Sequence, residues 1–203
     1  SMEAHILDGQ IYKRLHDESL RASQWLATVL GEPDWCKGYG LRHTHRTAQA
    51  PTKSTALLLG GVSEGINPDP GMAFEASSAV GELTRITPVF YNLMKERGVY
   101  NENTVNRIIE NLGSVQQEEW LSDHEKEVFK TAFEINQEAI INRAAARQKW
   151  LCQGQSLNLF VPGDGAEELI AHLISLIFTN ENILSQYYIY SRNGVVVNDE
   201  CVA

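Results

Sequence analysis

The sequence predicts an α/β fold in which helices connect parallel strands and a β-hairpin is added. From about residue 120 onward the order of elements reads helix, strand, helix, strand, which favours parallel pairing through helical crossovers. A pair of strands around Gly81 predicts a hairpin over 72–87. Only about three strands are available for a parallel sheet, and such a sheet needs both faces covered. We therefore expect one sector of a larger barrel or sheet.

The first part of the chain is expected to form one long helix and several short elements. Apolar residues over 9–30 fall mostly on one stripe, and Gly31 and Pro33 end that helix. The stripe consists of Ile11, Leu15, Leu20, Trp25, Leu26 and Leu30. Further elements expected in order are a weakly alternating strand at 41–49, an apolar run at 56–59, the hairpin, and helices near 88–97 and 103–112.

The longest helix is expected at 122–149. Ser122 and Glu125 have the spacing of a capping box at its start, and Phe129, Phe133, Ile140 and Ala144 form its apolar stripe. The elements that follow are a strand at 156–161, a Pro-Gly turn at 162–165, a helix at 166–178 and a tyrosine-rich strand at 185–192.

Composition limits the classes of partner that the chain is expected to have. It has 203 residues, 43% of them hydrophobic, and a formal net charge of −9, which argues against a direct nucleic-acid surface. No apolar run is long enough to span a bilayer, and the polar start does not resemble a signal peptide. The three cysteines are few and scattered, as in a reducing compartment. We expect a cytoplasmic protein without a membrane partner.

The stretch A-P-T-K-S-T-A at 50–56 reads as a turn that suits a phosphate group. Backbone N–H groups at a helix start attract anions, hydroxyls of Thr52, Ser54 and Thr55 add donors, and Lys53 adds a charge. The phosphate loop of nucleoside triphosphatases is absent. A plain Ser/Thr helix cap is the alternative interpretation of this turn.

The stretch S-Q-Y-Y-I-Y-S-R at 185–192 holds three tyrosines, Tyr187, Tyr188 and Tyr190. On local sequence alone it reads as an ordinary half-buried strand whose hydroxyls find partners at the rim. In a regular strand adjacent side chains point to opposite faces, so Tyr187 and Tyr188 would point apart.

Several segments, in order, resemble the large catalytic subunit of class I ribonucleotide reductase. Residues 50–68, A-P-T-K-S-T-A-L-L-L-G-G-V-S-E-G-I-N-P, are similar to that family's substrate-phosphate segment, P-T-A-S-T-A-x-x-L-G-x-x-E-x-I-E-P. Residues 101–116 resemble its stretch ending in N-G-S-I-Q, and residues 129–160 resemble its long helix and following strand. Y-Y-I-Y-S-R resembles its Y-Y-x-x-[ST]-R motif. The resemblance covers nearly all of residues 10–192.

The resemblance implies the C-terminal sector of that family's ten-stranded α/β barrel. The barrel part is expected over residues 2–194, with 195–203 as a flexible C-terminal tail. The family's finger-loop cysteine, its paired acid–base residues and its regulatory nucleotide site have no counterpart in this sequence. A split-gene product, as occurs in some phages, or a truncated fragment would explain this difference.

The resemblance also implies roles for individual residues. Pro51, Thr52, Lys53, Ser54 and Thr55 match the segment that holds the substrate diphosphate. Tyr187 and Tyr188 match the pair that relays a radical from the small subunit to the active-site cysteine. For the two rings to stack, the pair must sit where a strand begins or at a bulge. Lys53 and Asn67 depart from the family pattern, which usually has a small residue and a glutamate at these positions.

Cys201 matches the mobile C-terminal thiol pair that re-reduces the family's active site, although one thiol alone is present there. It is either a redox-active tail thiol or a residue without a role. Cys36 and Cys152 are interpreted as structural. His43 and His45 are too few for a metal site, so no metal ligands are expected.

The implied function is that of a component of ribonucleoside-diphosphate reductase, inactive alone. No cofactor is expected in this chain, because the metal-containing small subunit supplies the radical and an external dithiol reductant the electrons. Implied partners are the N-terminal part of the large subunit, the small subunit, a ribonucleoside diphosphate, and thioredoxin or glutaredoxin. The alternative is a non-catalytic module that keeps this sector of the fold and binds a nucleotide or the small subunit.

Overall fold

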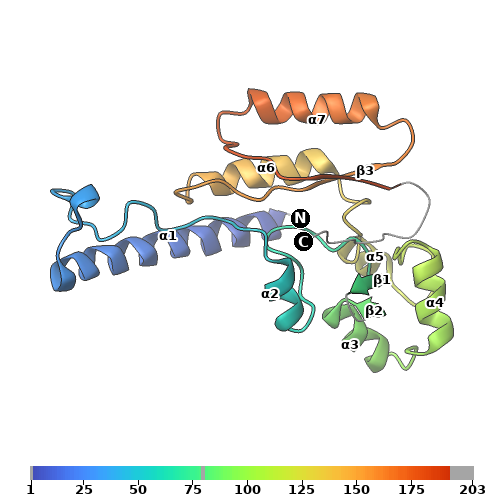
Figure 1. The fold of residues 1–203 in the computed structure, drawn as a ribbon. Helices are drawn as coiled ribbons and strands as arrows, with labels where there is room; N and C mark the ends of the chain where they lie inside the picture. The colour runs from blue at the N-terminus through green and yellow to red at the C-terminus, as the bar shows by residue number, and fades with distance from the viewer. Residues whose placement is uncertain (1, 79–80, 193–203) are drawn as a thin grey trace. The chain divides into compact units, whose positions relative to one another are not determined.

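The computed structural model describes residues 2–78 and 81–192 (Figure 1). These residues form two compact units, which are considered separately. The first unit combines the described residues up to 50 with 138–157 and 171–188, and the second combines 51–137, 158–170 and the described residues from 189. In chain order the elements are α1 Met2–Leu30, η1 Asp34–Cys36, α2 Lys53–Leu58, β1 Ala73–Ser78, β2 Gly81–Ile86, α3 Pro88–Glu96, α4 Glu102–Glu110, α5 Asp123–Val128, α6 Gln137–Gln148, β3 Leu159–Pro162, α7 Glu167–Thr179 and β4 Ile189–Arg192.

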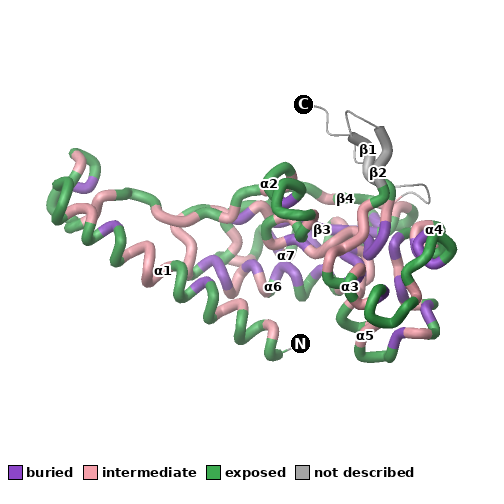
Figure 2. Tube along the Cα trace, turned by 90° about the horizontal axis from the view of Figure 1, so that it is seen from below, coloured by how far each residue is buried: buried purple, intermediate pink, exposed green. Residues whose placement is uncertain are grey.

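Helix α1 is the longest helix among the described residues, with 29 residues, and it begins earlier than predicted. Its predicted end at Leu30 is confirmed, and Gly31 takes the left-handed φ of 75° that commonly follows a helix. Of its residues, all of which are described, Tyr12 and Ser23 alone are buried. Figure 2 accordingly shows most of α1 as exposed or intermediate. Much of the predicted apolar stripe is therefore exposed to solvent. Trp25, for example, is 63% exposed.

The second unit contains the predicted hairpin and the helices around it. Strands β1 and β2 pair antiparallel, with Ala73 opposite Ile86, so the hairpin prediction is confirmed. Figure 1 shows α3, α4 and α5 gathered with the hairpin. Phe90 and Met94 of α3 and Ile108 of α4 are fully buried in one cluster with residues of β1 and the α4–α5 connection. Burial of this apolar cluster stabilises the unit.

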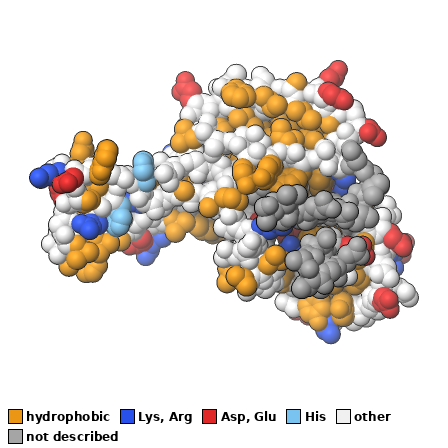
Figure 3. All heavy atoms as spheres, in the orientation of Figure 1, with side chains coloured by type: hydrophobic (Ala, Val, Ile, Leu, Met, Phe, Trp, Pro, Cys, Tyr) orange, Lys and Arg blue, Asp and Glu red, His pale blue; other side chains and the backbone are white. Residues whose placement is uncertain are grey.

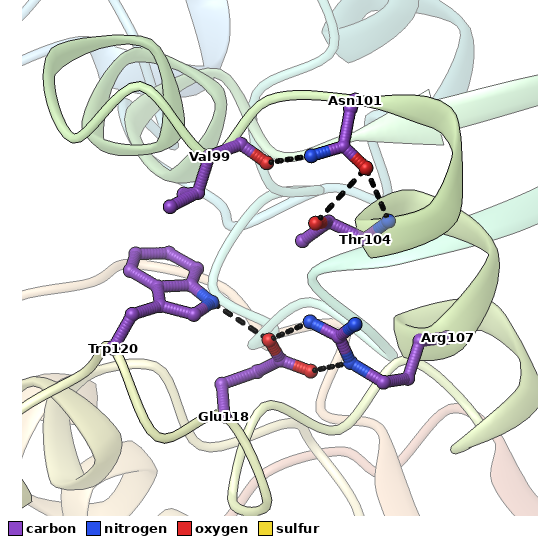
Figure 4. A network of polar contacts seen from close by, with 6 residues as sticks. All are labelled: Val99, Asn101, Thr104, Arg107, Glu118 and Trp120. Atoms are coloured by element: carbon purple, nitrogen blue, oxygen red, sulfur yellow. Dashed lines mark hydrogen bonds and ion pairs between the residues drawn. The ribbon is translucent and has the colours of Figure 1, made fainter.

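A polar network supports the α4–α5 connection (Figure 4). The Glu118 side chain is only 1% exposed, and its two oxygens accept hydrogen bonds from Arg107 Nε at 2.9 Å and Nη2 at 2.6 Å. Trp120 Nε1 donates a third hydrogen bond to Glu118 at 2.7 Å. At the start of α4 the Asn101 side chain caps the helix by accepting from the Thr104 N–H. Buried polar atoms need such partners, so the carboxylate depends on Arg107.

The predicted parallel pairing through a helical crossover is also confirmed. Strands β3 and β4 run parallel, with Leu159 opposite Ile189, and α7 lies between them in the sequence. Figure 3 shows hydrophobic side chains gathered on the surface over α7. The exposed large hydrophobic residues of this helix are Leu169, Ile174 and Phe178.

The predicted helix at 122–149 is wrong, because the chain forms two helices there. The capping box of Ser122 and Glu125 is present, but α5 ends at Val128 and α6 begins at Gln137. Between them the Ala132 N–H donates to the Asp69 carbonyl at 2.7 Å, and the Thr131 N–H donates to the Glu134 carboxylate at 2.8 Å. These amides therefore do not form the hydrogen bonds that a continuous helix needs.

The strand predictions are wrong at three places. Strand β3 starts at Leu159, not at 156. Residues 41–49 form no strand, and their single β-bridge joins Gln49 to Gln155. Strand β4 starts at Ile189, not at 185, so Tyr187 and Tyr188 precede it. Weak alternation at 41–49 did not predict pairing, because the local pattern does not specify a partner strand.

Candidate functional site

Tyr187 and Tyr188 lie side by side immediately before β4. Their ring centroids are 4.0 Å apart with an interplanar angle of 45°, and the side chains are 44% and 50% exposed. The expectation that the rings meet where a strand begins agrees with this geometry, since β4 starts at Ile189, directly after the pair. A hydrogen bond with the Tyr188 side chain raises the pKa of the Tyr187 phenol, and burial adds to this effect. The two phenols therefore form one pair of contacting side chains.

Tyr190 belongs to a different aromatic contact, in the second unit. Its ring stacks on Phe160 of β3 with centroids 5.3 Å apart and an interplanar angle of 20°. Phe160 in turn meets Phe133 edge to face, and the Arg192 guanidinium lies 4.4 Å from the Phe133 ring. Tyr190 thus takes part in packing across the β3–β4 pair.

The predicted phosphate turn leads into the short helix α2, Lys53–Leu58. Thr52 stands at the N-cap position, and its side chain makes no capping hydrogen bond in the described part of the chain. Its carbonyl accepts from the Ala56 N–H at 2.8 Å, which starts the helix. The Thr52 hydroxyl therefore does not form the plain helix cap of the alternative interpretation. Ser54 and Thr55 are exposed, whereas the adjacent Ala56 is buried and anchors the helix.

The turn is suited chemically to an anion. The N–H groups in the first turn of a helix have no acceptor within the helix, and the helix dipole is positive there. Two exposed hydroxyl side chains, Ser54 and Thr55, follow Thr52 at this end. The structure places Pro51–Thr55 in the second unit and the tyrosine pair in the first.

Comparison with known proteins decides the family. A protein family described as "Ribonucleotide reductase, barrel domain" matches residues 33–181, well over half of the chain. The chain belongs to this family.

Relatives and a solved structure agree with the assignment to the ribonucleotide reductase barrel domain. A "Putative ribonucleoside-diphosphate reductase large subunit" of Frog virus 3 is 40% identical over 80% of this chain and 28% of its own length. The large subunit of Invertebrate iridescent virus 6 is 33% identical over 95% of this chain and 20% of its own length. The class Id ribonucleotide reductase alpha subunit of Actinobacillus ureae matches with a TM-score of 0.80 and 37% identity, over 95% of this chain and 35% of that one.

The predicted fold class, a C-terminal sector of the ribonucleotide reductase α/β barrel, is confirmed by these matches. The chain spans less than a third of the length of both viral relatives. In the described residues no helix has the length and apolar character that a membrane span requires.

The other candidate residues of this barrel-domain chain are Cys201, His43 and His45. Cys201 lies outside the described residues. His43 and His45 line an open cavity of about 530 Å³ in the first unit, together with Pro33, Trp35, Cys36, Arg42 and Thr44. No cluster of three or more potential metal ligands occurs in residues 2–78 and 81–192.

Sequence reasoning missed a feature of Cys152, which the structure places beside Arg46 and Thr47. Arg46 Nη2 lies 3.7 Å from the Cys152 sulfur, and the Cys152 N–H donates to Thr47 Oγ1 at 3.2 Å. Burial raises the pKa of the thiol, but hydrogen bonds from the Arg46 main chain, the Thr47 side chain and the Arg46 side chain together lower it to about 7. No motif signals this contact, because the partners lie more than a hundred positions apart, 106 for Arg46 and 105 for Thr47.

We predict that alkylation of Cys152 by iodoacetamide reaches half of its maximal rate near pH 7. The thiolate is the nucleophile, so the rate rises with pH as the thiol ionises, whereas an ordinary thiol has its midpoint at about 8.5. Thr47→Val should move the midpoint upward, because it removes one of the stabilising hydrogen bonds. Site-resolved mass spectrometry measures this, with the buried Cys36 as the slow internal control. An ordinary midpoint for Cys152 would contradict the prediction.

Proposed function

We propose that the protein is a component of ribonucleoside-diphosphate reductase, which reduces ribonucleoside diphosphates to deoxyribonucleoside diphosphates by radical chemistry. In this proposal Tyr187 and Tyr188 relay the radical, and Pro51–Thr55 hold the substrate diphosphate. The observation that carries the proposal is the pair of adjacent phenol rings with centroids 4.0 Å apart, in a member of the ribonucleotide reductase barrel family.

In the proposed relay step one electron and one proton pass from one phenol to the other. An electron and the phenolic proton leave one tyrosine, and the neighbouring tyrosyl radical takes both up, so one O–H bond breaks and one forms. In this proposal the proton passes directly between the two neighbouring phenols, and the 4.0 Å separation of the ring centroids provides contact for the electron.

For the diphosphate we propose recognition by the start of α2. The backbone amides of its first turn would donate to phosphate oxygens, with the Ser54 and Thr55 hydroxyls as further donors. Lys53 would add a positive charge near the anion.

We predict that the double variant Ser54→Ala with Thr55→Val raises KM for the nucleoside diphosphate by about tenfold or more, with a smaller change in kcat. A hydrogen bond to a charged group contributes about 1.5 kcal/mol or more, and 1.4 kcal/mol is tenfold in affinity. Steady-state kinetics of the reconstituted enzyme measures this. Thr84→Val, at an exposed threonine of the same unit outside residues 50–68, is the matched control. An unchanged KM in the double variant would argue against phosphate binding here.

The proposed partners are those of the whole ribonucleotide reductase. The radical would come from the metal-containing small subunit, and the active-site cysteine from the N-terminal part of the large subunit. An external dithiol reductant, thioredoxin or glutaredoxin, would restore the active site, with Cys201 as its proposed contact on the tail. We expect no turnover from this chain alone, and a cytoplasmic location for the assembled enzyme.

Reconstitution tests the proposal. The chain is mixed with the matching N-terminal part, the small subunit, a dithiol reductant and a ribonucleoside diphosphate, and deoxynucleotide is assayed. Turnover that depends on adding this chain supports the proposal. Binding of the small subunit or the nucleotide without any turnover would instead support the non-catalytic module.

A further inference from the structure

The segment that precedes the tyrosine pair is attached to the chain before β3 by a serine side chain. Ser185 Oγ donates a hydrogen bond to the Gln155 carbonyl at 2.7 Å and accepts one from the Gln155 N–H at 2.9 Å. One hydroxyl therefore satisfies both backbone groups of Gln155, in the way that a partner strand's backbone would. Both residues lie in the first unit, as do Tyr187 and Tyr188.

Gln155 is a firm anchor for this contact. It is 3% exposed, and its side-chain nitrogen donates to the Ala144 carbonyl at 2.7 Å and to Gln148 Oε1 at 3.0 Å. Its side-chain oxygen accepts from Arg147 Nε at 3.2 Å. A buried amide with every group engaged has little freedom to move, so whatever bonds to its backbone is held in place.

The close approach of Ser185 depends on the absence of a side chain at Gly154. A Cβ built on Gly154 would lie 2.3 Å from Ser185 Oγ and 3.0 Å from its Cβ, too close for either atom to stay. The Gly154 carbonyl also accepts from the Gln49 N–H at 3.2 Å, which fixes the glycine from the other direction.

The register of these contacts continues that of the strand pair. Tyr187 N–H donates to the Leu157 carbonyl at 2.9 Å, two residues after the contact of Ser185 with Gln155. In both contacts the partners are 30 positions apart, the same offset as between Leu159 and Ile189 in β3 and β4. The chain carrying the phenols is thus held in register before β4 begins.

From this geometry we infer that Ser185 is a positioning residue for the Tyr187–Tyr188 pair. Its hydroxyl fixes the backbone two residues before Tyr187, and the Tyr187 amide fixes the next attachment point. Between these points and Ile189, where β4 begins, the two adjacent rings meet with centroids 4.0 Å apart, although regular alternation would point them to opposite faces. The relevance of this position to radical transfer rests on the proposed function, whereas the positioning itself does not.

Ser185→Ala in the full chain tests the inference without any partner. With ring-labelled tyrosine, NMR cross-peaks between the Tyr187 and Tyr188 rings report their contact, and ring chemical shifts against pH report the phenol titration. In the wild type the cross-peaks are expected, and the pKa of Tyr187 should lie above that of an ordinary tyrosine. In Ser185→Ala we expect weakened or lost cross-peaks and a pKa of Tyr187 that returns toward the ordinary value.

Two further variants sharpen the test. Gly154→Ala should give the same loss by pushing Ser185 away, while the hydroxyl itself is retained. Ser175→Ala removes an exposed hydroxyl from α7 in the same unit and should change neither signal. Cross-peaks and titration unchanged in Ser185→Ala would overturn the inference.

The reconstituted enzyme separates this inference from the proposed function. If both hold, Ser185→Ala should lower kcat several-fold while KM for the nucleoside diphosphate stays near the wild-type value. If the ring signals are lost in Ser185→Ala but kcat is unchanged, the positioning role stands and the relay is wrong. If neither the ring signals nor kcat respond, the positioning role is wrong.

Discussion

Tyr188→Phe is expected to reduce deoxynucleotide formation in the reconstituted enzyme to background. Phenylalanine keeps the ring that lies 4.0 Å from Tyr187 but has no O–H bond, so it can neither give up a phenolic proton nor accept one. The half-exposed ring makes few contacts that stabilise the fold, so stability and substrate affinity should stay near wild type. Product assays and substrate-binding measurements on the same preparation test this.

Two variants serve as comparisons for this prediction. Tyr187→Phe should be equally inactive, because the proposed relay uses both phenols. Tyr190→Phe should retain activity, since Tyr190 stacks on Phe160 in the packing of the second unit and its ring is kept. Activity of Tyr188→Phe equal to that of wild type would show the relay assignment to be wrong.

The tyrosine pair shows which parts of the candidate site the sequence predicts. The motif identified both residues, and the requirement for an irregular strand start followed from simple alternation. The attachment of Ser185 to the Gln155 backbone was not predictable. It depends on a serine hydroxyl and a side-chain-free glycine 31 positions earlier, which meet only in the folded chain.

The mistaken helix at 122–149 has a similar cause. The capping box and the apolar spacing were real local signals, and both α5 and α6 lie within the predicted range. At the break the Ala132 N–H makes a tertiary hydrogen bond to the Asp69 carbonyl and the Thr131 N–H a local one to the Glu134 carboxylate, while the Phe129 ring packs on Phe90 with centroids 5.2 Å apart. Helix propensity is a weak preference that such contacts override.

The second large effect is expected for Arg107→Met, which should destabilise the protein by about 3 kcal/mol or more at neutral pH. The Glu118 carboxylate, only 1% exposed, loses its arginine in this variant. Of the side-chain donors drawn to it in Figure 4, Trp120 remains. A buried charge without its partner is costly, whereas the lost Arg107 side chain was itself 50% exposed. Urea unfolding followed by tryptophan fluorescence measures the free energy of unfolding.

The effect of Arg107→Met should shrink as the pH falls. In the wild type the hydrogen bond from Arg107 is the main cause that lowers the pKa of Glu118, so this carboxylate contributes stability above the unfolded pKa of about 4.3 and loses it as the pH falls through the lower folded pKa. Without Arg107, burial favours the protonated acid, so the two proteins should differ least in acid. Arg97→Met breaks the more exposed pair with Glu125 and should cost less than about 1 kcal/mol. Equal losses for the two variants, or a loss for Arg107→Met that does not change with pH, would mean that the buried carboxylate does not depend on its arginine.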